Sequence, residues 1–189
     1  QWAKEFADEV IAPRVEINDR KAVFDTELMK LIADNGFFSA ILPEQYGGQA
    51  MDHIAYALMT EEIARVCSST RTLFSVQISL VEKPIWHYGT DEQKDKYLPA
   101  LASGEMIGCF GLTEPNAGSD AANQQTSAKK DGDHWVLNGQ KTWISNGTIA
   151  DVAIIIAQTD ASLGHKGMCA FLVETNTPGF TSRTMEPKL

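Results

Sequence analysis

Apolar residues recur at helical spacing through about the first 107 residues of the chain. Trp2, Phe6 and Val10 follow one another at intervals of four. A second stretch has similar spacing and contains Ile54, Leu58, Met59, Ile63 and Val66. Because residues three and four apart lie on one face of an α-helix, this spacing predicts that the first part of the chain is nearly all helical.

Local start and stop signals favour the same interpretation. Asp25 comes just before an apolar-periodic stretch and is typical of a helix N-cap, while Gly36 tolerates the left-handed conformation that ends many helices. Thr90 and Gln93 have the spacing of a capping box, in which each side chain bonds the backbone of the other residue. Residues 41–48 contain a proline and two adjacent glycines, so they are predicted to form a loop.

After about residue 107 the pattern changes to short apolar runs separated by turn dipeptides. These dipeptides are Asp131-Gly132, Asn138-Gly139, Asn146-Gly147 and Pro178-Gly179. Residues 135–137 and 142–144 flank the second of them, which predicts a hairpin. Residues 152–157 and 168–173 are rich in β-forming apolar side chains and predict two further strands.

The change in periodicity divides the chain into an N-terminal helical domain, residues 1–107, and a small β domain, residues 108–189. The predicted fold class is therefore α+β, with the β part forming a small barrel or sandwich. The chain has 189 residues and 43% hydrophobic side chains, which is enough to bury a core in each part.

The charge of the chain disfavours nucleic acid as a partner. Sixteen Lys and Arg residues against 25 Asp and Glu residues give a formal net charge of -9, and no run of basic residues interrupts this acidity. Most of the excess lies in the first 107 residues, where 10 basic side chains stand against 17 acidic ones. The longest apolar stretch, residues 150–157, is far shorter than the roughly 20 residues that span a bilayer, so no membrane span is expected.

Several familiar motifs are missing from the sequence. No G-x-G-x-x-G or P-loop pattern is present, and Ser119 lacks the G-x-S-x-G context of a hydrolase nucleophile. No metal is expected, because the histidines are isolated from one another: His53, His87, His134 and His165. The three cysteines are widely spaced and fit buried thiols in a reducing compartment: Cys67, Cys109 and Cys169.

Two segments of the β domain carry candidate chemistry. Residues 110–120 leave an apolar run and turn through Pro, Asn and Gly, which gathers hydroxyls and backbone N–H groups suited to an anion or the polar edge of a ring. The alternative is an ordinary turn capped by its own hydroxyl side chains. In residues 141–147, Trp143 and Ser145 are two apart and would share one face of a strand, where they could support a flat heterocycle. The alternative is an aromatic side chain packed inside the β domain.

Taken together and in this order, these segments resemble the acyl-CoA dehydrogenase family, flavoproteins that oxidise acyl-CoA thioesters. Residues 111–120 (GLTEPNAGSD) are similar to the family signature, and residues 143–147 (WISNG) are similar to its second flavin motif. In the helical half, residues 42–48 (LPEQYGG) resemble a family loop, and residues 88–99 resemble its lead-in to the β domain. The resemblance extends along essentially the whole chain.

The resemblance implies a helical domain, a β domain and a C-terminal four-helix bundle, with FAD bound between the β domain and the bundle. This chain has only the first two, and it stops inside the β domain, so it is interpreted as part of a longer protein. The catalytic base, usually a glutamate of the bundle, is expected outside this chain. The implied reaction is α,β-dehydrogenation of an acyl-CoA thioester to a trans-2-enoyl-CoA. Asn116 and residues 124–126 are most similar to short-chain, butyryl-type members.

The resemblance also implies individual roles. The expected FAD contacts are Phe110, Gly111, Leu112, Thr113, Glu114, Pro115, Asn116, Ala117, Gly118, Ser119, Trp143, Ile144 and Ser145. Thr113 is expected to bind the pyrimidine end of the flavin, and Ser119 to reach both the pyrophosphate and the acyl-CoA substrate. Trp143 would pack against the flavin on the side away from substrate. Ser145, where many members have threonine, would donate a hydrogen bond near flavin N5.

The implied partners are the acyl-CoA substrate, an electron-transfer flavoprotein and further copies of the full-length chain in a dimer or tetramer. The implied location is the bacterial cytoplasm or the mitochondrial matrix. Two other interpretations stay open. One is an acyl-CoA oxidase or flavin monooxygenase on the same scaffold, and the other is a non-catalytic flavin-binding paralogue.

Overall fold

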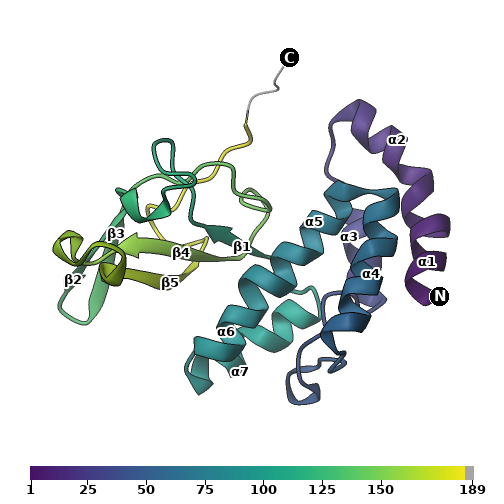
Figure 1. The fold of residues 1–189 in the computed structure, drawn as a ribbon, viewed down its shortest axis with the longest axis horizontal. Coiled ribbons are helices and arrows are strands. Elements are labelled where there is room, and N and C mark those ends of the chain that lie inside the picture. Colours follow the sequence, from purple (N-terminus) through teal and green to yellow (C-terminus); the bar gives the residue numbers. More distant parts are fainter. Residues whose placement is uncertain (186–189) are drawn as a thin grey trace. The chain divides into compact units, whose positions relative to one another are not determined.

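The structure is a computed structural model and describes residues 1–185 of the chain (Figure 1). It has two compact units, Gln1–Ile107 and Gly108–Leu189. The first unit is helical and the second contains a β-sheet, which confirms the predicted α+β fold class.

The first unit consists of helices joined by short connections. Its elements are α1 (Trp2–Phe6), η1 (Ala7–Ile11), α2 (Ala12–Lys21), α3 (Thr26–Asp34), η2 (Glu44–Tyr46), α4 (His53–Val66), α5 (Ser68–Ser75), η3 (Val76–Glu82), α6 (Lys83–Tyr88) and α7 (Asp91–Ala102). The Asp25 side chain accepts a hydrogen bond from the Leu28 N–H at 2.9 Å, so it caps α3 as predicted. Thr90 and Gln93 form the predicted capping box of α7.

The core of the helical unit contains aromatic and aliphatic side chains. Phe37, Phe38 and Phe74 are fully buried. The fully buried aliphatic side chains are Ile11, Ile32, Leu42, Ile63, Ile78, Leu98 and Leu101. The Trp2 indole stacks on the ring of Phe37 at a centroid distance of 4.1 Å, which fixes the first helix against this core.

The buried faces of two helices differ from those predicted by simple spacing. The π-helical turn η1 spaces its contacts by five residues rather than four, so Ile11 is fully buried along with Phe6, while Val10 is only half-buried. On α4 the buried residues are Met59 and Ile63. The predicted partners Ile54 and Leu58 are 73% and 59% exposed, because they lie on another face of the same helix.

The second unit is built on a mixed five-stranded sheet (Figure 1). Its strands are β1 (Gly108–Gly111), β2 (Ser127–Asp131), β3 (His134–Asn138), β4 (Val152–Gln158) and β5 (Met168–Glu174), with short 3-10 turns η4 (Ala121–Asn123) and η5 (Ala161–Gly167). Strand β4 pairs in parallel with β1 and at one point with β2, and in antiparallel fashion with β5. The predicted strands over 152–157 and 168–173 are therefore confirmed as β4 and β5.

The predicted hairpin around Asn138-Gly139 is wrong. Strand β3 pairs with β2 across the earlier turn at Gly132, which has a φ of 58°. Residues 142–144 are not a strand, because the Thr142 N–H donates to the Thr113 carbonyl at 2.9 Å and Trp143 has a φ of 60°. The Asn138-Gly139 dipeptide marks the end of β3, but the residues that follow it bond to the segment around Thr113 instead of to β3.

The three cysteines are free thiols with different environments. Cys109 is buried, and burial raises its pKa to about 11. Cys67 is half-buried and Cys169 is exposed, so the expectation of three buried thiols is wrong for Cys169, which lies on the edge strand β5. Within residues 1–185, no helix is both long and apolar enough to cross a membrane, and no group of three metal-ligating side chains is present.

Candidate functional site

The first candidate segment leaves the sheet and turns back on itself. After β1, the N–H of Glu114 donates to the carbonyl of Ala117 at 3.0 Å, and the N–H of Ala117 donates to the carbonyl of Glu114 at 3.2 Å. Pro115 and Asn116 form the exposed tip of this tight turn. Gly118 follows it, and a Cβ added there would meet nothing within 4 Å, so the backbone faces open space.

The second candidate segment is a series of turns rather than a strand. Trp143 and Asn146 have φ values of 60° and 64°, which residues other than glycine rarely adopt. The expectation that Trp143 and Ser145 share one face of a strand is therefore wrong. The Trp143 indole is nevertheless 55% exposed. A bulky residue held in a left-handed conformation costs of order 1–3 kcal/mol, and such strain clusters at functional sites.

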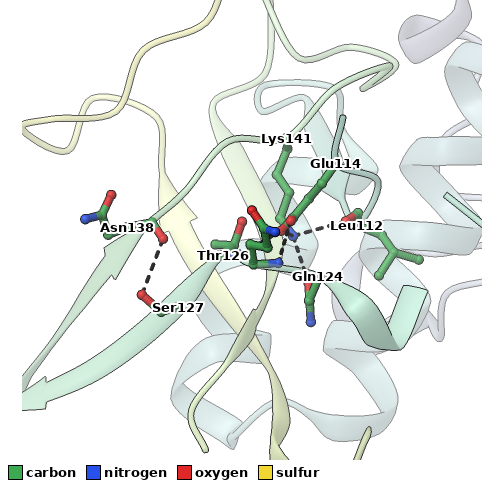
Figure 2. Close-up of polar contacts among 8 residues, drawn as sticks. Leu112, Glu114, Gln124, Thr126, Ser127, Asn138 and Lys141 are labelled. Atoms are coloured by element: carbon green, nitrogen blue, oxygen red, sulfur yellow. Dashed lines mark hydrogen bonds and ion pairs between the residues drawn. The ribbon is translucent and has the colours of Figure 1, made fainter. Parts of the chain in front are cut away.

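The two segments are held together by a cluster that we call the buried anchor: Lys141, Glu114 and Gln124. The Lys141 Nζ atom donates to the Leu112 carbonyl at 3.0 Å, to Glu114 Oε1 at 2.8 Å and to Gln124 Oε1 at 2.8 Å (Figure 2). Three acceptors require three N–H groups, so the amine is protonated. The side chains of Lys141 and Glu114 are only 9% and 5% exposed.

The carboxylate of Glu114 is satisfied on several sides. It accepts hydrogen bonds from the backbone N–H groups of Gln125 at 2.6 Å and Thr126 at 2.9 Å, in addition to Lys141. Burial acts to raise the pKa of Glu114, but these hydrogen bonds outweigh it and lower the pKa to about 2. The pKa of Lys141 is lowered, because its burial outweighs the attraction of Glu114. Glu114 and Lys141 are therefore both charged at neutral pH. The lowered pKa values show that their surroundings favour the Glu114 carboxylate and disfavour the Lys141 ammonium.

The residues predicted to contact a cofactor differ in how accessible they are. The exposed ones are Pro115, Asn116, Gly118, Ser119, Trp143 and Ser145. Half-buried are Phe110, Leu112, Thr113 and Ile144, and buried are Gly111, Glu114 and Ala117. The Glu114 side chain accepts hydrogen bonds inside the unit, so it stabilises the segment and does not present a group to the outside.

A polar cleft of about 530 Å³ lies beside the first segment. It is lined by Glu114, Pro115, Asn116, Gln125, Thr126, Ser127, Asn138, Gly139 and Gln140. A Cβ on Gly139 would collide with Thr126, so this wall of the cleft requires glycine. Most of its lining groups are amides and hydroxyls, which offer hydrogen bonds rather than apolar contacts.

The accessible residues fit a flavin dinucleotide chemically. Trp143 offers an exposed aromatic surface for a planar ring, and the open space beside Gly118 admits a phosphate group close to the backbone. Ser119 and Ser145 add exposed hydroxyls that can donate hydrogen bonds.

Sequence reasoning missed two members of the buried anchor as site residues. Lys141 is separated from Glu114 by 27 positions and from Gln124 by 17. No local pattern links residues so far apart. The available sequence signal for this contact was a lysine two residues before Trp143 in an acidic chain, and this signal does not indicate that the lysine is buried.

Comparison with known proteins gives a consistent result. The family model described as "Acyl-CoA dehydrogenase, N-terminal domain" matches residues 1–105, and "Acyl-CoA dehydrogenase, middle domain" matches residues 109–189. The human protein named "Short-chain specific acyl-CoA dehydrogenase, mitochondrial" is 41% identical over 189 residues, which cover 100% of this chain and 46% of that protein. The chain thus spans about half the length of the curated relatives it matches.

Solved structures agree with the family models. A chain from a study of the electron transferring flavoprotein of Acidaminococcus fermentans superposes with a TM-score of 0.95 at 43% identity, covering 98% of this chain and 49% of that one. A glutaryl-CoA dehydrogenase of Mycobacterium smegmatis in complex with FADH2 gives a TM-score of 0.92 at 42% identity, covering 99% and 47%.

Proposed function

The chain belongs to the acyl-CoA dehydrogenase family, and from this premise we propose that the protein catalyses the FAD-dependent α,β-dehydrogenation of a short-chain acyl-CoA thioester to a trans-2-enoyl-CoA. One observation carries the proposal. Hydrogen bonds hold the two candidate segments side by side although they are far apart in sequence, and the Trp143 indole of the second segment is exposed. The short-chain substrate rests on the human relative, whose name states that specificity.

FAD is the cofactor of this family and, when bound, supplies the acceptor for the hydride that leaves the β carbon. Thr113 and the neighbouring backbone of the first segment would hold the pyrimidine end of the flavin. Reduction places negative charge in that ring, and fixed hydrogen-bond donors stabilise the charge without reorganising. The group that removes the α proton is assigned to no residue of this chain.

Three further residues have distinct proposed roles. Trp143 would cover the face of the flavin away from substrate and keep water from it. Ser145 would donate a hydrogen bond near flavin N5. Ser119 would bind the pyrophosphate and approach the acyl-CoA, and the absence of a Cβ on Gly118 allows close contact there.

The proposed partners follow from the same family. We expect an electron-transfer flavoprotein to accept the electrons, and further copies of the full-length chain to form a dimer or tetramer. The structural relative from the study of the Acidaminococcus fermentans electron transferring flavoprotein supports this acceptor. Relatives in bacteria and in mitochondria support a location in the bacterial cytoplasm or the mitochondrial matrix.

The test uses the full-length protein with FAD. Butyryl-CoA is added without oxygen, loss of the flavin absorbance is followed by stopped flow, and enoyl-CoA is measured by chromatography. Ser145→Ala should slow flavin reduction at least tenfold, while Ser182→Ala, which changes an exposed serine elsewhere in the β unit, should not. A wild-type protein that binds FAD but yields no enoyl-CoA from any short acyl-CoA would refute the proposed reaction.

A further inference from the structure

The buried anchor joins the two segments at successive residues. The Leu112 carbonyl accepts from the Lys141 side chain at 3.0 Å, and the next carbonyl, that of Thr113, accepts from the Thr142 N–H at 2.9 Å. Two adjacent peptides of the first segment are therefore fixed by two adjacent residues of the second. Any movement of one segment must be followed by the other.

The Lys141 contact also sets the direction of a peptide plane. The described peptide bonds are all trans, and in a trans peptide the N–H points away from the carbonyl. With the Leu112 carbonyl turned inward to the ammonium group, the Thr113 N–H is turned to the opposite side. Thr113 is the residue proposed to bind the flavin, so the inward contact controls an outward-facing donor.

Stability alone does not explain a charged pair at this place. Replacing a buried ion pair by apolar side chains of similar volume is often neutral or stabilising, because both ions must be stripped of water. Coordination of Lys141 also has a local cost. Gln124 accepts from the ammonium through Oε1 while its buried Nε2 atom has no hydrogen-bond partner. What the ammonium provides and an apolar side chain cannot is a directed bond to the Leu112 carbonyl.

From these observations we propose that Lys141 is a positioning residue for the flavin. It aims the Leu112–Thr113 peptide at the pyrimidine edge of bound FAD, and Glu114 balances its charge and fixes its location. The inference deepens the proposed function and rests on it. Lys141 itself touches neither cofactor nor substrate, and it acts through Thr113.

The experiment compares full-length variants after loading with FAD. Lys141→Met removes the ammonium and leaves an unbranched apolar side chain one atom shorter, and Lys129→Met is the matched control, because Lys129 is exposed on β2. FAD affinity is measured by fluorescence titration, and the reduction potential and visible spectrum of the flavin are measured at saturating FAD. We expect Lys141→Met to weaken FAD binding at least tenfold, to alter the spectrum and to shift the potential to more negative values. The control should match wild type.

Second variants separate positioning from folding and from charge. Glu114→Gln keeps the Lys141 contact to Leu112 and leaves a net positive charge, so the potential should shift the other way. Lys141→Met combined with Glu114→Gln removes both charges and should stay folded, but should still bind FAD weakly.

Two outcomes would overturn the proposal. One is a lower melting temperature in Lys141→Met with an unchanged flavin spectrum and potential, which would assign Lys141 a structural role only. The other is a double variant that binds FAD as tightly as wild type. Failure of the wild-type protein to bind FAD would instead refute the proposed function, and the two failures are thereby distinguished.

Discussion

Glu82 gives the helical unit a pH dependence that a single substitution should remove. This glutamate is the last residue of η3, is 0% exposed, and neither of its carboxylate oxygens has a hydrogen-bond partner. Burial without a partner disfavours the charged form, so the pKa of Glu82 is raised well above its usual value of 4.5. The folded protein therefore holds a proton on Glu82 that the unfolded chain releases.

The sign and size of the effect follow from proton linkage. Below the unfolded pKa both states are protonated, and Glu82 adds no pH dependence. As the pH rises above that value, only the unfolded state ionises, and the free energy of unfolding falls by about 1.4 kcal/mol per pH unit until the folded pKa is reached. In Glu82→Leu this loss disappears, and the removal of a buried, unpaired polar group should add about 1–3 kcal/mol to stability.

Urea unfolding of the wild type, Glu82→Leu and Glu61→Gln at pH 5.5, 6.0 and 6.5 tests this reasoning. Glu61 is an exposed glutamate of α4 and is the matched control. Over this range the difference in unfolding free energy between Glu82→Leu and wild type should grow with pH, at up to about 1.4 kcal/mol per pH unit. The control should follow the wild type. A difference that stays constant with pH would show that Glu82 ionises normally in the folded state and would refute the argument.

Three further predictions concern single contacts. Hydrogen bonds lower the pKa of Glu114 to about 2, so the stability that ionised Glu114 contributes is present above the ordinary pKa of 4.5 and is lost as the pH falls towards 2. In Glu114→Gln, the free energy of unfolding should therefore fall by about 3 kcal/mol less over this pH range than in wild type, as measured by acid unfolding. Asp52→Ala removes the side chain that caps α4 through the Ala55 N–H and should lower the free energy of unfolding by about 1 kcal/mol in urea. Gly48→Ala places a Cβ against the Leu42 carbonyl and should cost about 1–3 kcal/mol, seen as a lower melting temperature.

Sequence reasoning predicted the elements whose determinants are local. The caps at Asp25 and Thr90 and the strands β4 and β5 depend on residues within a few positions, and all of them are confirmed. The exposed face of α4 was not predicted, because spacing shows that a helix has an apolar side but not which part of that side meets a neighbour. Ile54 and Leu58 fit the helical pattern as well as Met59 does, yet only Met59 is buried.

The candidate site shows the same division between local and distant information. The motif residues around Thr113 and Trp143 are site candidates that come from the sequence alone, and the strand expected at Trp143 is not formed. The reason lies in the contacts of Lys141 and Thr142, which reach residues of the first segment almost thirty positions away. Strand β3 ends at Asn138, but the residues after the Asn138-Gly139 dipeptide bond to the first segment instead of forming the predicted hairpin with β3.

Two buried glutamates of the described residues, Glu114 and Glu82, make stability depend on pH in opposite directions. Glu114 accepts three hydrogen bonds in the β unit and has a lowered pKa, so that unit loses this contribution as the pH falls. Glu82 accepts none in the helical unit and has a raised pKa, so that unit loses stability as the pH rises. Burial raises the pKa of both carboxyl groups, but only for Glu114 is this effect outweighed by hydrogen-bond donors. Acid should therefore weaken the β unit, while a rise in pH above the ordinary pKa of glutamate should weaken the helical unit.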